Sequence, residues 1–194
     1  MVVIVFDEGG IVDKFIGDAV MAVFGAPVPK PDDAIRALRA ALRMIEEVAR
    51  FNQPQPQWGG VEIDVGVGLH TGPLIAGNIG SDRKMEYTVI GDTVNVASRV
   101  ESLNQETKTK VLITQHCYDA TGKIFALREL PPMPVNGKEQ PVQMYEVLRE
   151  EVASARTEVL RWIDRGENDI HERSVSIRSA RARLPSINRS TAPK

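Results

Sequence analysis

The sequence predicts an α+β fold in which one sheet of mixed strand direction is covered by helices. Helix and strand patterns are interleaved along the chain, and pairs of strands separated by short turns occur among them. The chain has 194 residues, 42% of them apolar and 26% charged, which is ordinary for a globular domain with a full core. We therefore expect one compact unit followed by a tail.

The first predicted elements are the two strands of a hairpin over residues 11–25. Gly17 and Asp18 interrupt the apolar run there, and a two-residue loop with glycine first suits a tight hairpin turn. Asp18 is then expected at the tip of the hairpin. Residues 32–51 carry apolar side chains at helical spacing with charged ones between them, which predicts an amphipathic helix that starts near Asp32.

The middle of the chain alternates between strand and helix. Residues 61–69 alternate apolar with polar or small side chains, which predicts a strand with one buried face. Residues 70–80 turn the chain back into a second strand, and residues 86–91 supply a third before a helix from Asp92 to about Leu103. The remaining predicted elements are a strand at 110–114, a short helical turn at 115–122, a strand at 124–130 and a last strand at 142–150.

The character of the chain changes at about residue 149. Residues 149–165 carry apolar side chains at helical spacing and are predicted to form a helix. Residues 166–194 are rich in serine and arginine without apolar periodicity, which predicts a basic, disordered tail. The alternative is that this tail docks on an anionic partner. We therefore place the folded domain at residues 1–148.

Charge and cysteine content restrict the function. A formal net charge of −2 argues against nucleic-acid binding over a broad positive surface. Cys117 is the single cysteine, so an intrachain disulfide is impossible and a reducing compartment is expected. No apolar stretch is long enough to span a bilayer. We therefore expect a cytoplasmic protein that has no transmembrane segment and binds no nucleic acid.

Two aspartates follow the same dipeptide, Ile-Gly, in different surroundings. Asp92 precedes a helical pattern, so its simplest role is to accept hydrogen bonds from backbone N–H groups of the first turn. Asp18 interrupts an apolar hairpin, where a carboxylate must meet water, a cation or a hydrogen-bond donor to offset its desolvation. Exposure to solvent at the turn and a bound ion both satisfy that requirement.

Three blocks of sequence resemble the class III nucleotide cyclases, the family of adenylyl and guanylyl cyclase catalytic domains. The blocks are "GGIVDKFIGDAVMAVFGAP", "VGVGLHTGPLIAGNIG" and "EYTVIGDTVNVASRVESL", in the order and with the spacing of that family. The resemblance covers residues 1–148 and implies a ferredoxin-like, βαββαβ-type domain with helices packed on a mixed sheet. It implies the conversion of ATP to 3′,5′-cyclic AMP and pyrophosphate in intracellular signalling.

The resemblance also implies a metal site. In the family, two divalent ions, Mg²⁺ or Mn²⁺, lie between two aspartates and the nucleotide triphosphate, and Asp18 matches the second aspartate. Such ions activate the ribose 3′-hydroxyl that attacks the α-phosphorus and screen charge on the phosphates. Hard cations of this kind take oxygen ligands, which suits a carboxylate.

The residues that read the purine are matched by Lys14 and Thr88. An ammonium can donate to adenine N1, and a threonine oxygen can accept from the N6 amino group. Guanine would present N1–H and N2–H donors and would call for a carboxylate. Lys14 and Thr88 therefore resemble the residue pair of adenylyl cyclases, and we expect ATP as substrate. The alternative is a guanylyl cyclase.

Two further residues are matched on the helix after Asp92. Asn95 and Arg99 are four residues apart, which places both on one face of a helix. They match the asparagine that orients the ribose and the arginine that stabilises charge on the reacting phosphate. Family sites form across a head-to-tail homodimer, with the metal ligands from one chain and the residues matched by Lys14, Thr88, Asn95 and Arg99 from the other.

The match departs from the family pattern at two places. Family domains begin with a strand that carries the first metal aspartate, followed by two helices, whereas this sequence starts inside the second helix, and Asp7 is too near Asp18 in sequence to replace the missing ligand. Asn136 stands where related enzymes have a lysine that contacts the triphosphate, and Lys138 is the nearby candidate for that contact.

Three functions therefore compete. The first is an adenylyl cyclase. The second is a non-catalytic cyclase-like module that pairs with another cyclase chain and lends it the matched residues. The third is an interaction protein whose basic tail binds nucleic acid or membrane. We rank them in this order on the sequence.

Overall fold

The computed structural model describes residues 1–53, 62–122, 124–135, 137–151 and 174–179, the last by its backbone alone. The helices are α1 (Val2–Asp7), α2 (Asp33–Phe51), α3 (Asp92–Thr107) and α4 (Gln115–Thr121). The strands are β1 (Ile11–Ile16), β2 (Ala19–Phe24), β3 (Val67–Gly72), β4 (Ile75–Ser81), β5 (Lys84–Ile90), β6 (Val111–Thr114), β7 (Phe125–Met133), β8 (Val142–Glu150) and β9 (Ser174–Ser179).

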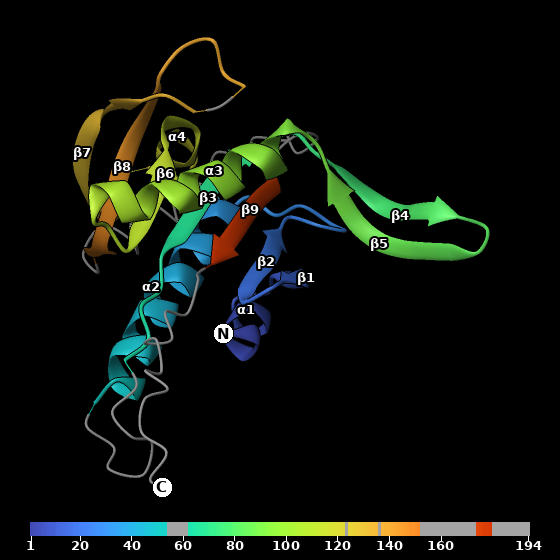
Figure 1. Ribbon diagram of the computed structural model, residues 1–194, viewed down its shortest axis with the longest axis horizontal. Helices are drawn as coiled ribbons and strands as arrows, with labels where there is room; N and C mark the ends of the chain where they lie inside the picture. The colour runs from blue at the N-terminus through green and yellow to red at the C-terminus, as the bar shows by residue number, and fades with distance from the viewer. Residues whose placement is uncertain (54–61, 123, 136, 152–173, 180–194) are drawn as a thin grey trace, which may run out of the picture.

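Seven of the strands form one mixed sheet in the order β1-β2-β9-β3-β6-β8-β7. β3 and β6 are parallel and the other neighbours are antiparallel. β4 and β5 pair only with each other and project from the body of the domain as a ribbon (Figure 1). The predicted α+β class with helices on a mixed sheet is confirmed.

Helices cover both faces of the sheet. Leu69 on β3 belongs to the large core cluster that it shares with Leu38 of α2, whereas a side chain on neighbouring Gly68 would meet the backbone of α3 at Glu101. Because successive strand residues point to opposite faces, α2 and α3 lie on opposite sides of β3. The predicted hairpin at 11–25 and helix at 32–51 are also confirmed.

The position between β2 and β3 in the sheet is occupied by β9. Ile177 lies opposite Ala22 of β2 on one side and opposite Leu69 of β3 on the other, with antiparallel pairing in both directions. The sequence predicted a disordered tail for this segment, and for these six residues that prediction is wrong. The segment "SVSIRS" does alternate valine and isoleucine with serine, but the Ser/Arg-rich flanks conceal so short a period-two pattern. The predicted helix at 149–165 lies almost entirely outside the described residues.

Two further expectations are corrected. The predicted strand at 61–69 begins only at Val67. Before Val67, the backbone of Ile63 bonds to the side-chain amide of Asn52, as strand residues bond to a neighbouring strand. The Asn52 nitrogen donates to the Ile63 carbonyl (2.7 Å), and the Asn52 oxygen accepts from the Ile63 N–H (2.9 Å). Asp92 is not the N-cap of α3, because Gly91 holds that position and Asp92 is the first residue of the helix; its carboxylate pairs with the Lys138 ammonium at 2.5 Å.

Two titratable side chains are buried at β3: His70 of the strand itself and Cys117 of α4, which contacts the strand. The thiol of Cys117 contacts the Thr71 hydroxyl at 3.2 Å, and burial raises its pKa to about 11, as is typical of a structural thiol. The His70 ring contacts the Thr114 hydroxyl at 2.8 Å. Burial, followed by His116 and Lys138, lowers the pKa of His70 to about 4, while Asp92 acts in the opposite direction.

His70 should make the stability of the domain depend on pH. Its pKa falls from 6.5 in the unfolded chain to about 4 in the fold, so the unfolded state binds more protons between these values. Its contribution is therefore complete above pH 6.5 and is lost as pH falls toward 4, by roughly 3 kcal/mol in total. Urea unfolding of His70→Asn across this range should show a flatter pH dependence than the wild type. His116→Asn removes only a lesser cause of the shift and should keep most of the pH dependence, because burial is the first cause. Equal slopes for His70→Asn and the wild type would contradict the expectation.

Removal of β9 should loosen both of its neighbours. A chain ending at residue 173 loses the strand, and a chain ending at residue 179 keeps it as the matched control. Each buried hydrogen bond lost costs roughly 1 kcal/mol, so amide hydrogen exchange in β2 and β3 should be faster in the shorter chain. Identical exchange in the two chains would show that β9 does not pair there.

Candidate active site

Asp18 lies at the tip of the β1–β2 hairpin, as the sequence predicted. Gly17 has a φ of +63°, a backbone conformation that favours glycine, and Asp18 follows it as an exposed turn residue. No described side chain forms a hydrogen bond or ion pair with this carboxylate. Asp18 is therefore open to solvent and able to meet a ligand from outside the hairpin.

A β-bulge in β1 places two charged residues together. Val12 is opposite Ala22 and Lys14 is opposite Met21, so Asp13 is an extra residue without a partner in β2. A bulge of this kind re-aims side chains that a regular strand would send to opposite faces. Asp13 and Lys14 consequently contact each other, with 3.3 Å between the carboxylate and the ammonium.

The bulge joins β1 to β5 through side chains. The Lys14 ammonium donates to the Thr88 hydroxyl at 2.9 Å, and that hydroxyl donates to the Asp13 carboxylate at 3.1 Å. The side chain of Asp13 is 1% exposed and that of Lys14 is 41% exposed. The structure thus brings together the two residues matched to purine reading, although they are 74 positions apart in the chain.

The sequence reasoning missed Asp13. The signal that could have found it is an acid inside an apolar strand pattern, directly before a lysine of interest. Such an acid is costly to bury unless it is paired and hydrogen-bonded. The bulge that makes the pairing possible has no sequence signature of its own, because it depends on the register with β2.

A second group of candidate residues lies on α3 and on the loop after β7. Asn95 is exposed and Arg99 is half-buried, four residues apart on the helix. Hydrogen bonding to Lys138 lowers the pKa of Asp92, and the charge of Arg99 acts in the same direction. The group therefore presents two cations and an amide around the first turns of α3.

The loop after β7 passes close to the Arg99 side chain at Gly137. Its φ is +80°, and a Cβ added there would lie 2.9 Å from the Arg99 Nη1 atom. Any larger residue would therefore displace the guanidinium as well as strain the backbone. Lys138 follows directly and pairs with Asp92, while Asn136 lies outside the described residues.

The two groups remain separate in this chain. The hairpin group consists of Asp13, Lys14, Asp18 and Thr88, and the helix group consists of Asp92, Asn95, Arg99 and Lys138. Among the residues that the structure describes, no hydrogen bond or ion pair links one group to the other. One chain therefore presents two surfaces, each with part of the predicted chemistry.

Asp18 is the residue of the described chain that matches a metal aspartate of the family, and its carboxylate is exposed. No three His, Cys, Asp or Glu side chains come together there to hold a metal. Asp7 is unsuitable, because its carboxylate pairs with Arg43 at 3.0 Å. Mg²⁺ is often held by one or two carboxylates together with substrate phosphates, so Asp18 fits as one ligand of a shared site.

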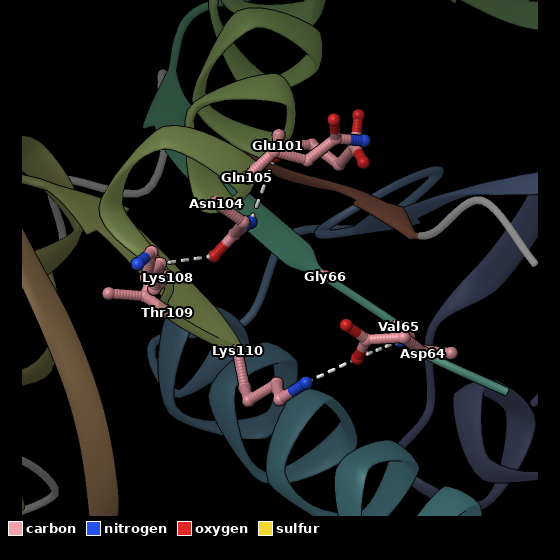
Figure 2. A pocket seen from close by; sticks show the side chains of 9 residues that line it. All are labelled: Asp64, Val65, Gly66, Glu101, Asn104, Gln105, Lys108, Thr109 and Lys110. Carbon is pink, nitrogen blue, oxygen red and sulfur yellow. Dashed lines mark hydrogen bonds and ion pairs between the residues drawn. The ribbon is translucent and has the colours of Figure 1, made fainter. Parts of the chain in front are cut away.

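A cavity of about 420 Å³ lies elsewhere, near the C-terminal end of α3. Figure 2 shows that Asn104 is central to its hydrogen bonding, and this side chain donates to the Glu101 carbonyl (3.0 Å) and accepts from the Thr109 hydroxyl (2.8 Å). Lys110 pairs with Asp64 at its rim. None of the predicted site residues lines this cavity, and its polar groups hold α3 against the sheet.

The fold and these residue groups define a nucleotide cyclase catalytic domain. The family model of the adenylate and guanylate cyclase catalytic domain matches residues 11–149. The chain therefore belongs to this family, the class III nucleotide cyclases, as the three sequence blocks suggested.

Individual relatives include both kinds of cyclase. The terminal-differentiation specific adenylate cyclase of Dictyostelium discoideum is 38% identical over 86% of the chain, which spans only 8% of that relative. The adenylyl cyclase CyaB from P. aeruginosa has a TM-score of 0.67 and 32% identity, covering 77% of this chain and 76% of that one. The guanylate cyclase domain of RhGC from Catenaria anguillulae, in complex with GTP, has a TM-score of 0.66 and 33% identity, covering 77% and 78%.

The chain spans a small part of the curated relatives it matches, and its structural neighbours include adenylyl and guanylyl cyclases. Family membership therefore does not identify the purine, and an inference about ATP or GTP must rest on the side chains matched to purine reading, Lys14 and Thr88. Within the described residues, no helix is long and apolar enough to cross a bilayer.

Proposed function

We propose that this chain is the catalytic domain of an adenylyl cyclase that converts ATP to 3′,5′-cyclic AMP and pyrophosphate with the aid of Mg²⁺ or Mn²⁺. The contact between Lys14 and Thr88 carries this proposal. It places a hydrogen-bond donor beside an acceptor on the partly exposed surface between β1 and β5. Adenine presents the complementary pair, an acceptor at N1 and a donor at the N6 amino group.

Asp18 would hold a divalent ion together with phosphate oxygens of the nucleotide. Two bound ions supply activation of the 3′-hydroxyl and screening of the charge on the phosphates. The part of this chain is to present an exposed carboxylate on a rigid hairpin, so that the ligand is in place before the nucleotide arrives. Asp18 alone does not complete the coordination of two ions. The other ligands would be oxygens of the nucleotide and carboxylates that do not lie beside Asp18 in the described part of the chain.

The helix group would bind the ribose and the phosphates. Arg99 lies so close to Gly137 that a Cβ there would be 2.9 Å from its Nη1 atom, and its guanidinium would stabilise charge that builds up on the reacting phosphate. Asn95 is exposed one turn earlier and would orient the ribose. Lys138 is engaged with Asp92 and would exchange that partner for the triphosphate.

A head-to-tail homodimer would bring Asp18 of one copy to Lys14, Thr88, Asn95 and Arg99 of the other, the division that the family resemblance implies. Large apolar side chains are exposed on the hairpin and the ribbon. These exposed residues are Phe15, Ile16, Ile75, Met85, Tyr87 and Ile90. A second copy that covers this surface would bury apolar area and complete two sites by one symmetric contact.

The second candidate is a non-catalytic module that pairs with another cyclase chain. The observation that favours it is that no three His, Cys, Asp or Glu side chains come together, at Asp18 or elsewhere, in the described part of the chain. Such a module would lend the helix group and the purine-reading pair to a partner that holds both ions. The predicted guanylyl activity and a role of residues 166–194 in binding nucleic acid or membrane have no supporting observation of this kind.

Turnover tests the proposal directly. The chain is incubated with ATP and either Mn²⁺ or Mg²⁺, and the product is identified by chromatography and mass spectrometry. Cyclic AMP is expected, and Asp18→Asn should reduce its formation by at least about 10²-fold. Asp119→Asn, an exposed carboxylate on α4, is the control and should leave the rate unchanged. If the chain forms cyclic nucleotide only when mixed with another cyclase chain, the non-catalytic module is the correct function.

Complementation tests the shared site. Arg99→Ala alone should lower the rate by roughly 10² to 10³, whereas Arg128→Ala on β7 should not. In a mixture of Asp18→Asn and Arg99→Ala chains, half of the dimers are mixed and each has one intact site, so about a quarter of the wild-type activity should return. No recovery on mixing, with each variant folded, would place the two groups in the same site of one chain.

A further inference from the structure

Asp13 is a buried carboxylate with two polar neighbours, and the proposed chemistry gives it no role. Its side chain is 1% exposed, and it contacts the Lys14 ammonium at 3.3 Å and the Thr88 hydroxyl at 3.1 Å. Both neighbours belong to the pair proposed to read the purine. A charge held so close to the recognition atoms, away from water, acts on them strongly.

We propose that Asp13 is a positioning residue that fixes the Thr88 hydroxyl as a hydrogen-bond acceptor and so makes the site selective for a 6-aminopurine over a 6-oxopurine. The inference rests on the proposed function, since it concerns the choice of nucleotide at the same site. Asp13 acts through Thr88 and Lys14 and needs no contact with the nucleotide.

The direction of each hydrogen bond follows from the chemistry of the three groups. An ammonium can only donate and a carboxylate can only accept, whereas a hydroxyl has one proton to donate and lone pairs to accept. Thr88 lies between Lys14 and Asp13, so its proton must point to Asp13 and its oxygen must accept from Lys14. The lone pair that remains can take one more donor, and no proton is left to offer an acceptor.

Asp13 also limits Lys14. Of the three N–H groups of this ammonium, one is directed to Thr88 and one faces Asp13. The third remains available on a side chain that is 41% exposed. The pair therefore offers the solvent one donor from Lys14 next to one obligatory acceptor from Thr88.

This pattern accepts one purine edge and rejects the other. A 6-aminopurine presents a ring acceptor at N1 beside an amino donor, and both find a complement. A 6-oxopurine presents an N1–H donor beside a carbonyl acceptor, so donor faces donor and acceptor faces acceptor. A site built around fixed hydrogen bonds discriminates strongly, because the wrong ligand leaves desolvated groups unpaired.

Asp13→Asn removes the constraint with little change in volume. An amide can donate to the Thr88 oxygen, which lets the hydroxyl turn its proton toward the ligand. Competition binding of ATP and GTP to the full chain, in the presence of Mg²⁺, measures the ratio of the two Kd values. We expect the wild type to prefer ATP and Asp13→Asn to lose on the order of tenfold of that preference. Asp119→Asn controls for the loss of one negative charge.

Thr88→Val provides a second route if Asp13→Asn does not fold. It removes the hydroxyl with similar volume and should reduce the preference to the same extent, while Thr88→Ser should restore it. In a double-mutant cycle, Asp13→Asn should have no further effect on the ratio once Thr88 is valine. A purely structural role of Asp13 would weaken both nucleotides equally and leave the ratio unchanged.

The outcomes separate this inference from the proposed function. A wild type that prefers ATP, with the same preference in Asp13→Asn, overturns the role of Asp13 and leaves the adenylyl cyclase in place. An additive effect of the two substitutions also overturns it, because Asp13 would then act independently of Thr88. A wild type that prefers GTP, or binds neither nucleotide, overturns both.

Discussion

The two groups of candidate site residues are carried by different parts of the sheet, and the backbone pairing of β9 joins these parts. The hairpin of β1 and β2 holds Lys14 and Asp18, while β3 supports α3 with Asn95 and Arg99. β2 and β3 are both paired with β9 and not with each other. The register of this one strand therefore decides how the hairpin is positioned relative to α3, and with it the spacing of the two surfaces that a dimer would bring together.

A buried charge organises the purine-reading surface. Asp13 would be costly to bury alone, and Lys14 and Thr88 offset that cost by pairing with it. The same contacts fix the orientation of the two side chains that would face the base. The proposed selectivity and the stability of this surface would thus depend on one set of hydrogen bonds, which the β-bulge in β1 makes possible.

Membership of the cyclase family and the identity of the substrate depend on different observations. The family is shown by the match over residues 11–149 and by solved structures that include both adenylyl and guanylyl cyclases. The proposed preference for ATP rests on the donor and acceptor pattern of Lys14 and Thr88. The roles proposed for Arg99 and Asp18 are the same whichever purine is bound, since they concern the phosphates and the ion that would accompany them.

The sequence by itself determined the local elements and the family: the hairpin with Asp18 at its tip, the amphipathic helix α2, and the helix that carries Asn95 and Arg99. These follow from periodicity and turn chemistry, which are properties of neighbouring residues. The tertiary structure alone decided the contacts between distant segments, namely β9 between β2 and β3, the Asp92–Lys138 pair and the hydrogen bond from Thr88 to Asp13. Such contacts depend on sheet register and on which side chain reaches a partner across the fold, and no local pattern records either of these.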